Sequence, residues 1–303
     1  MAEISVIIPV YNTGNILFET VNTVLEQSVS DFELIIVDDG SSSETSAIID
    51  SLTDRRIRVI HQGNQGVAAA RNTGIAAASG KYIALLDHDD LWHKDKLKVQ
   101  KAILDADESI VLTYSSIECF GKSESIQIPD YKVITGDPFL SELEQNKIHS
   151  TSCVMFKRCT VLENQIEFST EAVPCDDWYF YLQLAQYGKF VHTPDVPVYY
   201  RLHESNLSSD VKRMYSAGIW VLQKIQEESR EISKQTQLAA KVILEVLNRH
   251  LAKHYRGLAY LAVKQRDFSA ASRYLKEDLR ADFSLKGALG FILFSLLALF
   301  RQR

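Results

Sequence analysis

The chain contains 303 residues, of which 46% are hydrophobic and 24% are charged. This composition excludes a disordered or fibrous protein and suffices for one large domain or two modest ones with hydrophobic cores. The formal net charge of −6 conceals an acidic body and a basic tail, because the residues from Val246 onward contain 11 Lys and Arg against 4 Asp and Glu.

The beginning of the chain passes directly from Met1, Ala2 and Glu3 into a strand-like run. It lacks the basic segment, apolar segment and small-residue cleavage site of a secretory signal, so we expect a cytoplasmic protein. The cysteines have no Cys-x-x-Cys spacing and indicate neither a zinc site nor a disulfide framework.

The first third of the sequence alternates strand patterns with helix patterns. Residues 4–10 (ISVIIPV) form an apolar, β-branched run that is typical of a buried strand. Further elements are expected as strands at 33–37, 57–61 and 82–86 and as helices at 43–52 and 67–78. This alternation predicts an α/β fold with a mixed, mostly parallel sheet flanked by helices.

Polar and acidic residues follow the ends of three of these strands. They are Pro9-Val10-Tyr11-Asn12, Asp38-Asp39-Gly40-Ser41 and Asp87-His88-Asp89-Asp90. In open parallel sheets, ligands lie beyond the carboxyl ends of the strands, near a switch in strand order. We therefore expect these three segments to form one site.

Two of these features have both a structural and a functional interpretation. Asp38 and Asp39 suit a turn with a helix cap, but their carboxylates can also accept hydrogen bonds from a base or a ribose. Arg71, on the Ala-rich helix over 67–78, is either a surface residue or able to fork onto a phosphate or base.

The crowded carboxylates of Asp87, Asp89 and Asp90 suit either a solvated turn or a cation site, because their mutual repulsion needs solvent or a cation to offset it. Oxygen ligands of this kind suit Mg²⁺ or Mn²⁺ bridging a diphosphate.

Beyond residue 110 the pattern is less regular. We expect β segments near 110–120 and 153–157, an acidic and aromatic helix from Asp176, and a pair of strands near 189–203. This part of the chain is interpreted as an acceptor-facing half built on the same core.

From about Ser208 the chain is expected to be helical. Residues 250–282 read as two amphipathic helices around 265–267, which resemble a single tetratricopeptide-like hairpin packed against the catalytic domain. Residues 287–300 (GALGFILFSLLALF) are apolar but too short to span a bilayer. Burial against the helical region competes with attachment to an anionic membrane surface, which the basic end favours.

The expected organisation comprises an α/β domain in two halves, a helical region and an apolar end. The boundaries are 1–207 (a nucleotide-binding half 1–110 and an acceptor-facing half 111–207), 208–283 and 284–303.

Four segments in this order resemble the motifs of family 2 glycosyltransferases with the GT-A fold. They are VIIPVYN at 6–12, VDDGS at 37–41, GVAAARNTGIAAASGKYIALLDHDD at 66–90 and CDDWYFYLQLA at 175–185. The resemblance covers about residues 4–205, and the ordered set is far more specific than any single motif. It implies an enzyme that moves a sugar from a nucleotide diphosphate donor to an acceptor hydroxyl with inversion.

The resemblance also implies roles for the matched residues on the nucleotide side. The base would be held by Pro9, Val10, Tyr11 and Asp39. Asp38 would support that loop, and Arg71 would help to position the nucleotide.

In the Asp-x-Asp element, the resemblance implies that Asp87 serves the ribose and that Asp89 binds Mn²⁺ or Mg²⁺. The adjacent Asp90 leaves the direct metal ligand open. Arg201 and His203 match a closing Tyr-Arg-x-His element and would approach the diphosphate or metal, although His203 also suits a polar strand end.

Asp177 matches the catalytic base of the Glu-Asp-Trp element, and Asp176 stands where Glu is commoner. A single carboxylate that takes the acceptor proton fits inversion by direct displacement. The pair also suits a helix N-terminus without catalytic role. His149 is a further candidate near the sugars.

Two other classes of function remain as alternatives. A sugar nucleotidyltransferase would need a Gly-rich, basic phosphate loop after the first strand, which instead ends in Pro-Val-Tyr-Asn-Thr. A non-catalytic domain could bind a nucleotide sugar or a partner. The favoured interpretation is a transferase with a UDP-sugar donor and a glycan or lipid-linked acceptor in cell-envelope polysaccharide synthesis. We expect it on the inner face of the membrane and without a nucleic-acid partner.

Overall fold

The computed structural model describes residues 2–121, 133–203, 207–282 and 289–295, and the chain divides into two compact units. Unit 1 comprises Met1–Glu142, Asn146–Thr170 and Asp176–Asn206, and unit 2 comprises Leu143–Gln145, Glu171–Cys175 and Leu207–Arg303.

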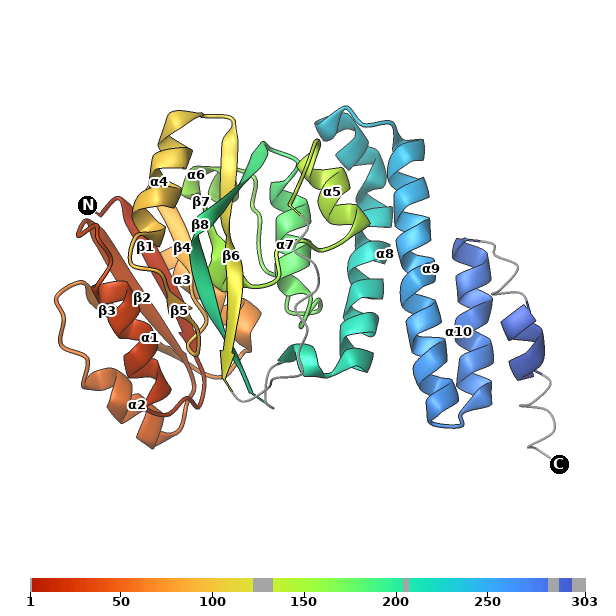
Figure 1. Ribbon diagram of the computed structural model, residues 1–303, viewed down its shortest axis with the longest axis horizontal. Coiled ribbons are helices and arrows are strands. Elements are labelled where there is room, and N and C mark those ends of the chain that lie inside the picture. Colours follow the sequence, from red (N-terminus) through yellow and green to blue (C-terminus); the bar gives the residue numbers. More distant parts are fainter. Residues whose placement is uncertain (1, 122–132, 204–206, 283–288, 296–303) are drawn as a thin grey trace. The chain divides into compact units, whose positions relative to one another are not determined.

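Unit 1 is built on a sheet of eight strands with helices packed against it (Figure 1). The strands are β1 (Ile4–Val10), β2 (Phe32–Asp39), β3 (Ile57–Gln62), β4 (Tyr82–Leu85), β5 (Leu91–Trp92), β6 (Ile110–Gly121), β7 (Val154–Lys157) and β8 (Lys189–Leu202). The helices are α1 (Ile16–Leu25), α2 (Ser43–Asp50), α3 (Val67–Ala77), α4 (Lys96–Ala106), α5 (Pro138–Glu144, whose last two residues belong to unit 2), η1 (Thr151–Cys153), α6 (Arg158–Glu163) and α7 (Asp176–Leu184).

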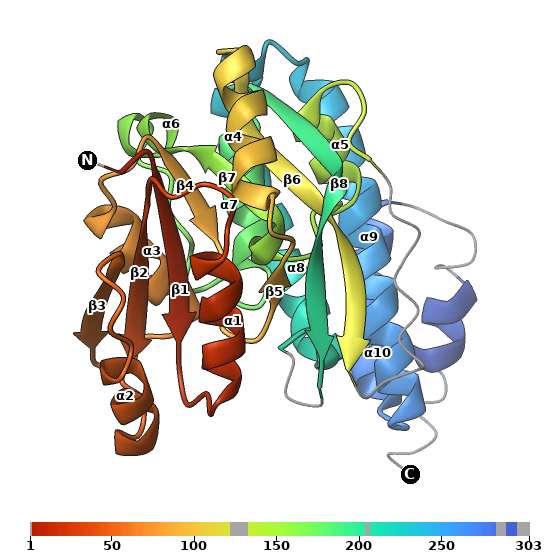
Figure 2. The ribbon, with the colours of Figure 1, turned by 60° about the vertical axis from the view of Figure 1, so that its left-hand side comes forward.

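The strand order is β3-β2-β1-β4-β7-β6-β8-β5. The four strands from β3 to β4 are parallel, and Figure 2 shows β3, β2 and β1 side by side in the same direction. Strand β7 pairs antiparallel with both β4 and β6, whereas β6 and β8 are parallel. The chain moves outward from β1 to β3 and returns to β4 on the other side of β1. The switch in strand order therefore lies between β1 and β4, at the site that the sequence predicts.

The core of the parallel part forms around β1 and β4, whose residues are buried on both faces. All residues of β1 are buried, including Ile4, Ile7 and Ile8, and each such side chain contributes about 1.5–3 kcal/mol relative to exposure. Helix α3 packs on β1 and β2, and a Cβ at Gly74 would collide with the Ile7 side chain. The small residues of α3 therefore allow a close approach that holds Arg71 near the carboxyl edge of the sheet.

The expected pair of strands near 189–203 is wrong, since this segment forms the single strand β8. In its register with β6, Ser115 pairs with Thr193 and Ile117 pairs with Val198. The extra residues of β8, which include Pro194 and Pro197, form an irregularity that accommodates both prolines without ending the strand. After it, β8 also pairs antiparallel with β5, which follows the acidic element.

From Leu207 onward, the described part of unit 2 is mainly helical. Its long elements are η2 (Leu207–Ser209), α8 (Val211–Thr236), α9 (Ala240–Lys264) and α10 (Phe268–Ala281). Helices α9 and α10 meet in a turn at Gln265, Arg266 and Asp267, and the Asp267 carboxylate caps α10 by accepting the Ala270 N–H at 2.9 Å. The turn lies where the helical periodicity predicts it.

Of the apolar segment predicted over 287–300, residues 289–295 are helical and the rest lie outside the described residues. Phe294 stacks on Phe268 at 6.1 Å and packs on a cluster of alanines that includes Ala271. Leu289, Ile292 and Leu293 are more than half exposed. Among the helices that the structure describes, none has an apolar stretch long enough to cross a bilayer.

Candidate active site at the carboxyl edge of the unit 1 sheet

The loop after β1 is tied to the loop after β2. Pro9 and Val10 are buried in β1, and the Tyr11 side chain is 48% exposed beyond the strand end. Asn12, with φ of 48°, donates its backbone N–H to Ser41 Oγ at 3.1 Å. Its Oδ1 accepts the Ser42 N–H at 2.8 Å. The sequence analysis placed Asn12 in this strand-end segment without giving it a role, and the structure shows that it ties the Tyr11 loop to the loop after β2.

Asp38 supports this edge of the sheet through three hydrogen bonds. Its carboxylate accepts from the Ser41 N–H at 3.0 Å and the Ser46 hydroxyl at 2.9 Å, and it bonds His61 Nδ1 at 2.9 Å. Burial alone would raise the pKa of Asp38, but the hydrogen bonds, led by those from Ser41 and His61, hold it below its usual value. The side chain is directed into the protein, which suits the predicted supporting role.

Asp39 lies at the N-terminus of α3. Its Oδ1 accepts from Gln62 Nε2 at 2.7 Å and from the Gln65 N–H at 2.9 Å, and its Oδ2 accepts from the Gly66 N–H at 2.7 Å. Gly66 caps α3 with φ of 90°, a conformation that glycine adopts readily. The predicted base-binding carboxylate is thus held close to the strand end by the loop that leads into α3.

Arg71 is a buried cation at the site. Its side chain is 8% exposed, and its guanidinium donates from Nη2 to Asp87 Oδ1 at 2.8 Å and from Nη1 to Asp176 Oδ2 at 2.7 Å. Burial would lower the pKa of Arg71, but the charges of Asp87 and Asp176 raise it above its usual value. The Phe168 ring lies 5.4 Å below the guanidinium. Arg71 therefore joins the acidic element to the start of α7, and the fork predicted for a phosphate or base holds two carboxylates.

The acidic element after β4 contains three carboxylates in different surroundings. Asp87 is partly exposed, and besides Arg71 it accepts the Thr151 hydroxyl at 3.1 Å. Asp89 is less exposed, and its Oδ2 lies 2.7 Å from His203 Nε2. The Asp89 carbonyl accepts from Arg201 Nε at 2.8 Å. The structure thus brings Asp87, Asp89, Arg201 and His203 together, as the sequence motifs predict.

Asp90 has the opposite environment, because it is fully buried. Its Oδ1 accepts the Arg201 N–H at 3.0 Å, and its Oδ2 accepts the hydroxyls of Ser152 at 2.6 Å and Ser150 at 3.4 Å. Burial raises the pKa of Asp90 well above its usual value, and the charges of Asp89 and Asp87 raise it further. Both oxygens of Asp90 thus serve protein donors, whereas Asp87 and Asp89 keep partly exposed carboxylates.

The chemistry of these donors fits a divalent cation. Asp89 and His203 offer a carboxylate oxygen and an imidazole nitrogen that are both partly accessible, and Mg²⁺ or Mn²⁺ takes its other ligands from water and diphosphate oxygens. A cation there would also offset the repulsion among the three carboxylates. Within the described ranges, no group of three or more His, Cys, Asp and Glu side chains is placed so that it could hold a metal ion.

The predicted base lies in the first turn of α7. Asp177 Oδ1 accepts the Trp178 N–H at 2.7 Å, and the side chain keeps partial access to solvent. Burial and the charge of Asp176 raise the pKa of Asp177 to about 7, although the charge of Arg71 lowers this pKa. A carboxylate with a pKa near the ambient pH is suited to general-base catalysis.

A second buried acid lies near Asp177, and the sequence analysis did not select it. Glu142 at the end of α5 is fully buried, and burial, together with the charge of Asp177, raises its pKa to about 8. Its carbonyl accepts the Trp178 indole N–H at 2.9 Å, which fixes the start of α7 against α5. By sequence it reads as an ordinary acid of a surface helix, so no signal distinguishes it.

His149 is partly buried, and burial lowers its pKa. It lies two residues before Thr151, whose hydroxyl contacts both Arg71 and Asp87. The sequence analysis selected His149 from this segment and missed the hydroxyl of Thr151.

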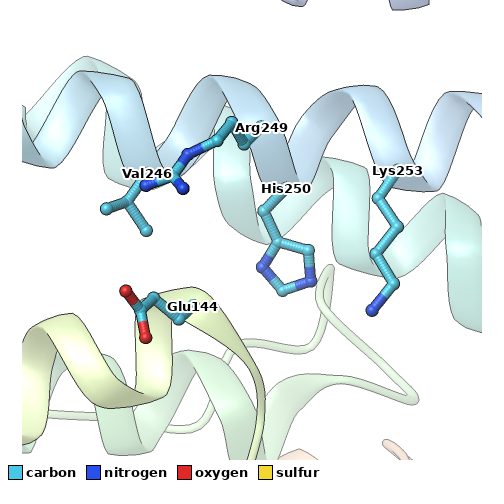
Figure 3. Close-up of a pocket in the computed structure, with 5 residues that line it drawn as sticks. All are labelled: Glu144, Val246, Arg249, His250 and Lys253. Carbon is cyan, nitrogen blue, oxygen red and sulfur yellow. The ribbon is translucent and has the colours of Figure 1, made fainter.

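Unit 2 contains a cavity of about 380 Å³ that includes none of the predicted site residues (Figure 3). Its lining consists of Glu144, Val246, Arg249, His250 and Lys253. His250 is held by its Nδ1, which bonds the Leu143 carbonyl at 2.8 Å. Its lining mixes the cations Arg249 and Lys253 with the acid Glu144.

Comparison with known proteins places these motifs in a family. Residues 5–161 match the sequence model described as Glycosyl transferase family 2. An uncharacterized glycosyltransferase of Rickettsia felis is 44% identical over 117 residues, which are 38% of this chain and 19% of that protein. This chain matches between 18% and 23% of the length of that protein and of two other rickettsial relatives.

Solved structures share the fold. Residues 1–349 of S. aureus TarS in complex with UDP-GlcNAc align with a TM-score of 0.71 at 18% identity, over 97% of this chain and 89% of that one. The mannosyltransferase PcManGT from Pyrobaculum calidifontis, in complex with GDP-Man and Mn²⁺, aligns with a TM-score of 0.59 at 19% identity, over 99% and 88% of the two chains. The predicted GT-A fold, a mixed sheet with a helical C-terminal region, is confirmed.

Proposed function

Because this chain belongs to glycosyl transferase family 2, we propose that it is a metal-dependent inverting glycosyltransferase. Its donor is a nucleotide diphosphate sugar, with UDP as the nucleotide. Its acceptor is a hydroxyl of a glycan or lipid-linked saccharide of the cell envelope. The UDP preference is supported by the shared fold with TarS, which binds UDP-GlcNAc.

One observation carries the proposal. The donor-side carboxylate Asp87 and Asp176, next to the base, bind the same guanidinium of Arg71 at 2.8 Å and 2.7 Å. A nucleotide site at the switch point and a carboxylate with a pKa of about 7 on Asp177 are thereby held in one rigid arrangement. A domain that only binds a nucleotide sugar has no use for such a base.

The reaction follows from these positions. The acceptor hydroxyl gives its proton to the Asp177 carboxylate as its oxygen bonds to the anomeric carbon. The bond from that carbon to the diphosphate oxygen breaks, and UDP leaves with the electron pair, so one displacement inverts the configuration. A divalent cation, when bound, stabilises the negative charge of the diphosphate. Asp89 and His203 would hold it, and the Tyr11 loop and Asp39 would hold the base.

The test is the release of nucleoside diphosphate from a panel of UDP-, GDP- and dTDP-sugars, with Mn²⁺ or Mg²⁺ and with EDTA as control. We expect slow, metal-dependent hydrolysis of one UDP-sugar in the absence of acceptor. If no donor turns over and none raises the thermal midpoint, the alternative of a non-catalytic domain holds. Release of pyrophosphate from a nucleoside triphosphate and a sugar phosphate would instead indicate a nucleotidyltransferase.

We further propose that unit 2 rests on the cytoplasmic face of an anionic membrane. The helix at 289–295 turns Leu289, Ile292 and Leu293 outward, with exposed fractions of 63%, 56% and 53%. An apolar face beside a basic segment is typical of a surface-bound helix, and its binding weakens as salt screens the charges.

Sedimentation with phosphatidylglycerol vesicles tests this placement. We expect the wild type to pellet with the vesicles and a triple variant, Leu289→Ser, Ile292→Ser and Leu293→Ser, to stay in the supernatant. The matched control changes three other exposed apolar residues of unit 2, Val211, Val242 and Tyr260, to serine and should pellet like the wild type. Equal partition of the wild type and the first variant would contradict the proposal.

A further inference from the structure

The short helix η1 presents two hydroxyls to the acidic element. Thr151 Oγ1 accepts from Arg71 Nη2 at 3.0 Å, so its own hydrogen is available to Asp87, whose two oxygens both lie at 3.1 Å. Since a hydroxyl has one hydrogen, the donor on one side determines the direction of the bond on the other. Thr151 therefore orients the Asp87 carboxylate.

Ser152 acts in the same way one residue later. Its Oγ accepts the backbone N–H of Asp87 at 3.0 Å and donates to Asp90 Oδ2 at 2.6 Å. One side chain thus binds the backbone of Asp87 and the carboxylate of Asp90, on either side of Asp89. Asp90 Oδ1, bound to the Arg201 N–H at 3.0 Å, completes the support.

Buried side chains also bind the backbone carbonyls of η1, the segment that carries the two hydroxyls. The Trp92 indole N–H donates to the Ser152 carbonyl at 2.8 Å, and Gln100 Nε2 donates to the Cys153 carbonyl at 2.8 Å. Lys96, fully buried, lies 4.0 Å above the Trp92 ring and donates to Gln100 Oε1 at 2.9 Å. Thr151 and Ser152 are at most 2% exposed, so neither is a surface hydroxyl.

We propose that Thr151 and Ser152 are positioning residues of the donor site. Thr151 orients the Asp87 carboxylate toward the nucleotide. Ser152 binds Asp87 and Asp90, on either side of Asp89, and so fixes the position of Asp89, which would bind the metal. The inference rests on the proposed function and adds to it two residues that contact neither substrate nor metal. Partners of this kind fix the orientation of direct ligands, and their loss typically costs about 10–100-fold in metal affinity or activity.

The first test compares Thr151→Val with Thr151→Ser in UDP binding, measured by calorimetry with saturating Mn²⁺. Valine keeps the shape of threonine without its hydroxyl, so we expect UDP binding about 10-fold weaker, whereas serine should remain within about threefold of the wild type. Thr113→Val is the matched control. It removes another fully buried hydroxyl of unit 1, one that donates to the Met155 carbonyl at 3.3 Å and contacts none of the acidic residues by hydrogen bond.

The second test measures Mn²⁺ affinity for Ser152→Ala by electron paramagnetic resonance in the presence of UDP. We expect affinity to fall about 10–100-fold while Thr113→Val stays unchanged. Thermal midpoints show whether each variant is folded, and the two variants test the inference independently.

The outcomes separate the two proposals. If the wild type binds UDP with Mn²⁺ and both variants bind equally well, the positioning role is refuted and the proposed function stands. A similar loss in Thr113→Val would also refute it, because general loosening of the unit would then explain the effect. If the wild type binds no nucleoside diphosphate, the proposed function fails and this inference fails with it.

Discussion

Replacing Asp177 with Asn is expected to lower kcat about 10²–10⁴-fold while UDP affinity stays within about twofold. The reason is that the amide cannot accept the acceptor proton, and positioned general bases typically contribute a factor of this size. The loss should appear in the release of nucleoside diphosphate from the accepted donor. Asp195→Asn is the matched control, since Asp195 is an exposed carboxylate of β8 in the same unit.

The pH dependence supplies a second readout. The pKa of Asp177 is raised to about 7, so the base is protonated and inactive below that pH, and kcat/KM of the wild type should fall as the pH drops through about 7. A carboxyl whose pKa is raised in the folded state destabilises the fold progressively as the pH rises from its unfolded value to its folded one. Asn removes this penalty, so Asp177→Asn should gain more thermal stability at pH 8 than at pH 4. An unchanged kcat, or a variant unfolded at pH 8, would contradict the assignment.

The fold was largely predictable because its central parallel strands β1, β2 and β4 contain continuous apolar runs. The run at 4–10 coincides with β1, and the Ala-rich pattern at 67–78 differs from α3 by one residue. Strand β8 was not predictable, because two prolines in one segment normally indicate a break. What keeps it a strand is its pairing with β6 and β5, and those partners are distant in the sequence.

The site shows the same division between local pattern and long-range contact. The sequence motifs select Asp87, Asp89, Asp90 and Asp177, but they leave open which acid of the element faces a cation. The different surroundings of the three acids depend on long-range contacts, such as the Ser152 hydroxyl that donates to the Asp90 carboxylate at 2.6 Å. No periodicity or spacing predicts such a pairing. Arg71 is comparable, because its partner Asp176 lies on a different element and withdraws the guanidinium from the solvent.

The second large effect is expected from Asp89→Ala, which should weaken Mn²⁺ binding by at least about 100-fold. Loss of an outer partner costs about 10–100-fold, and Asp89 is proposed as a direct ligand. Asp89 is partly exposed and 2.7 Å from His203, so the alanine variant should keep the fold. Paramagnetic resonance of free Mn²⁺ in the presence of UDP measures the affinity without any turnover.

His88→Ala is the matched control, because His88 occupies the variable position between Asp87 and Asp89 and is not expected to bind the metal. It should retain the Mn²⁺ affinity of the wild type, and His203→Ala should lose about 10-fold in affinity, as the weaker of the two donors.

Comparison of Asp89→Ala with Asp90→Asn tests which of the two acids binds the metal. Asn at this position still accepts hydrogen bonds through its amide oxygen, so Mn²⁺ affinity should fall less than in Asp89→Ala. If Asp90→Asn loses more affinity than Asp89→Ala, then Asp90 is the direct ligand, and the cation must bind on the buried side of the element.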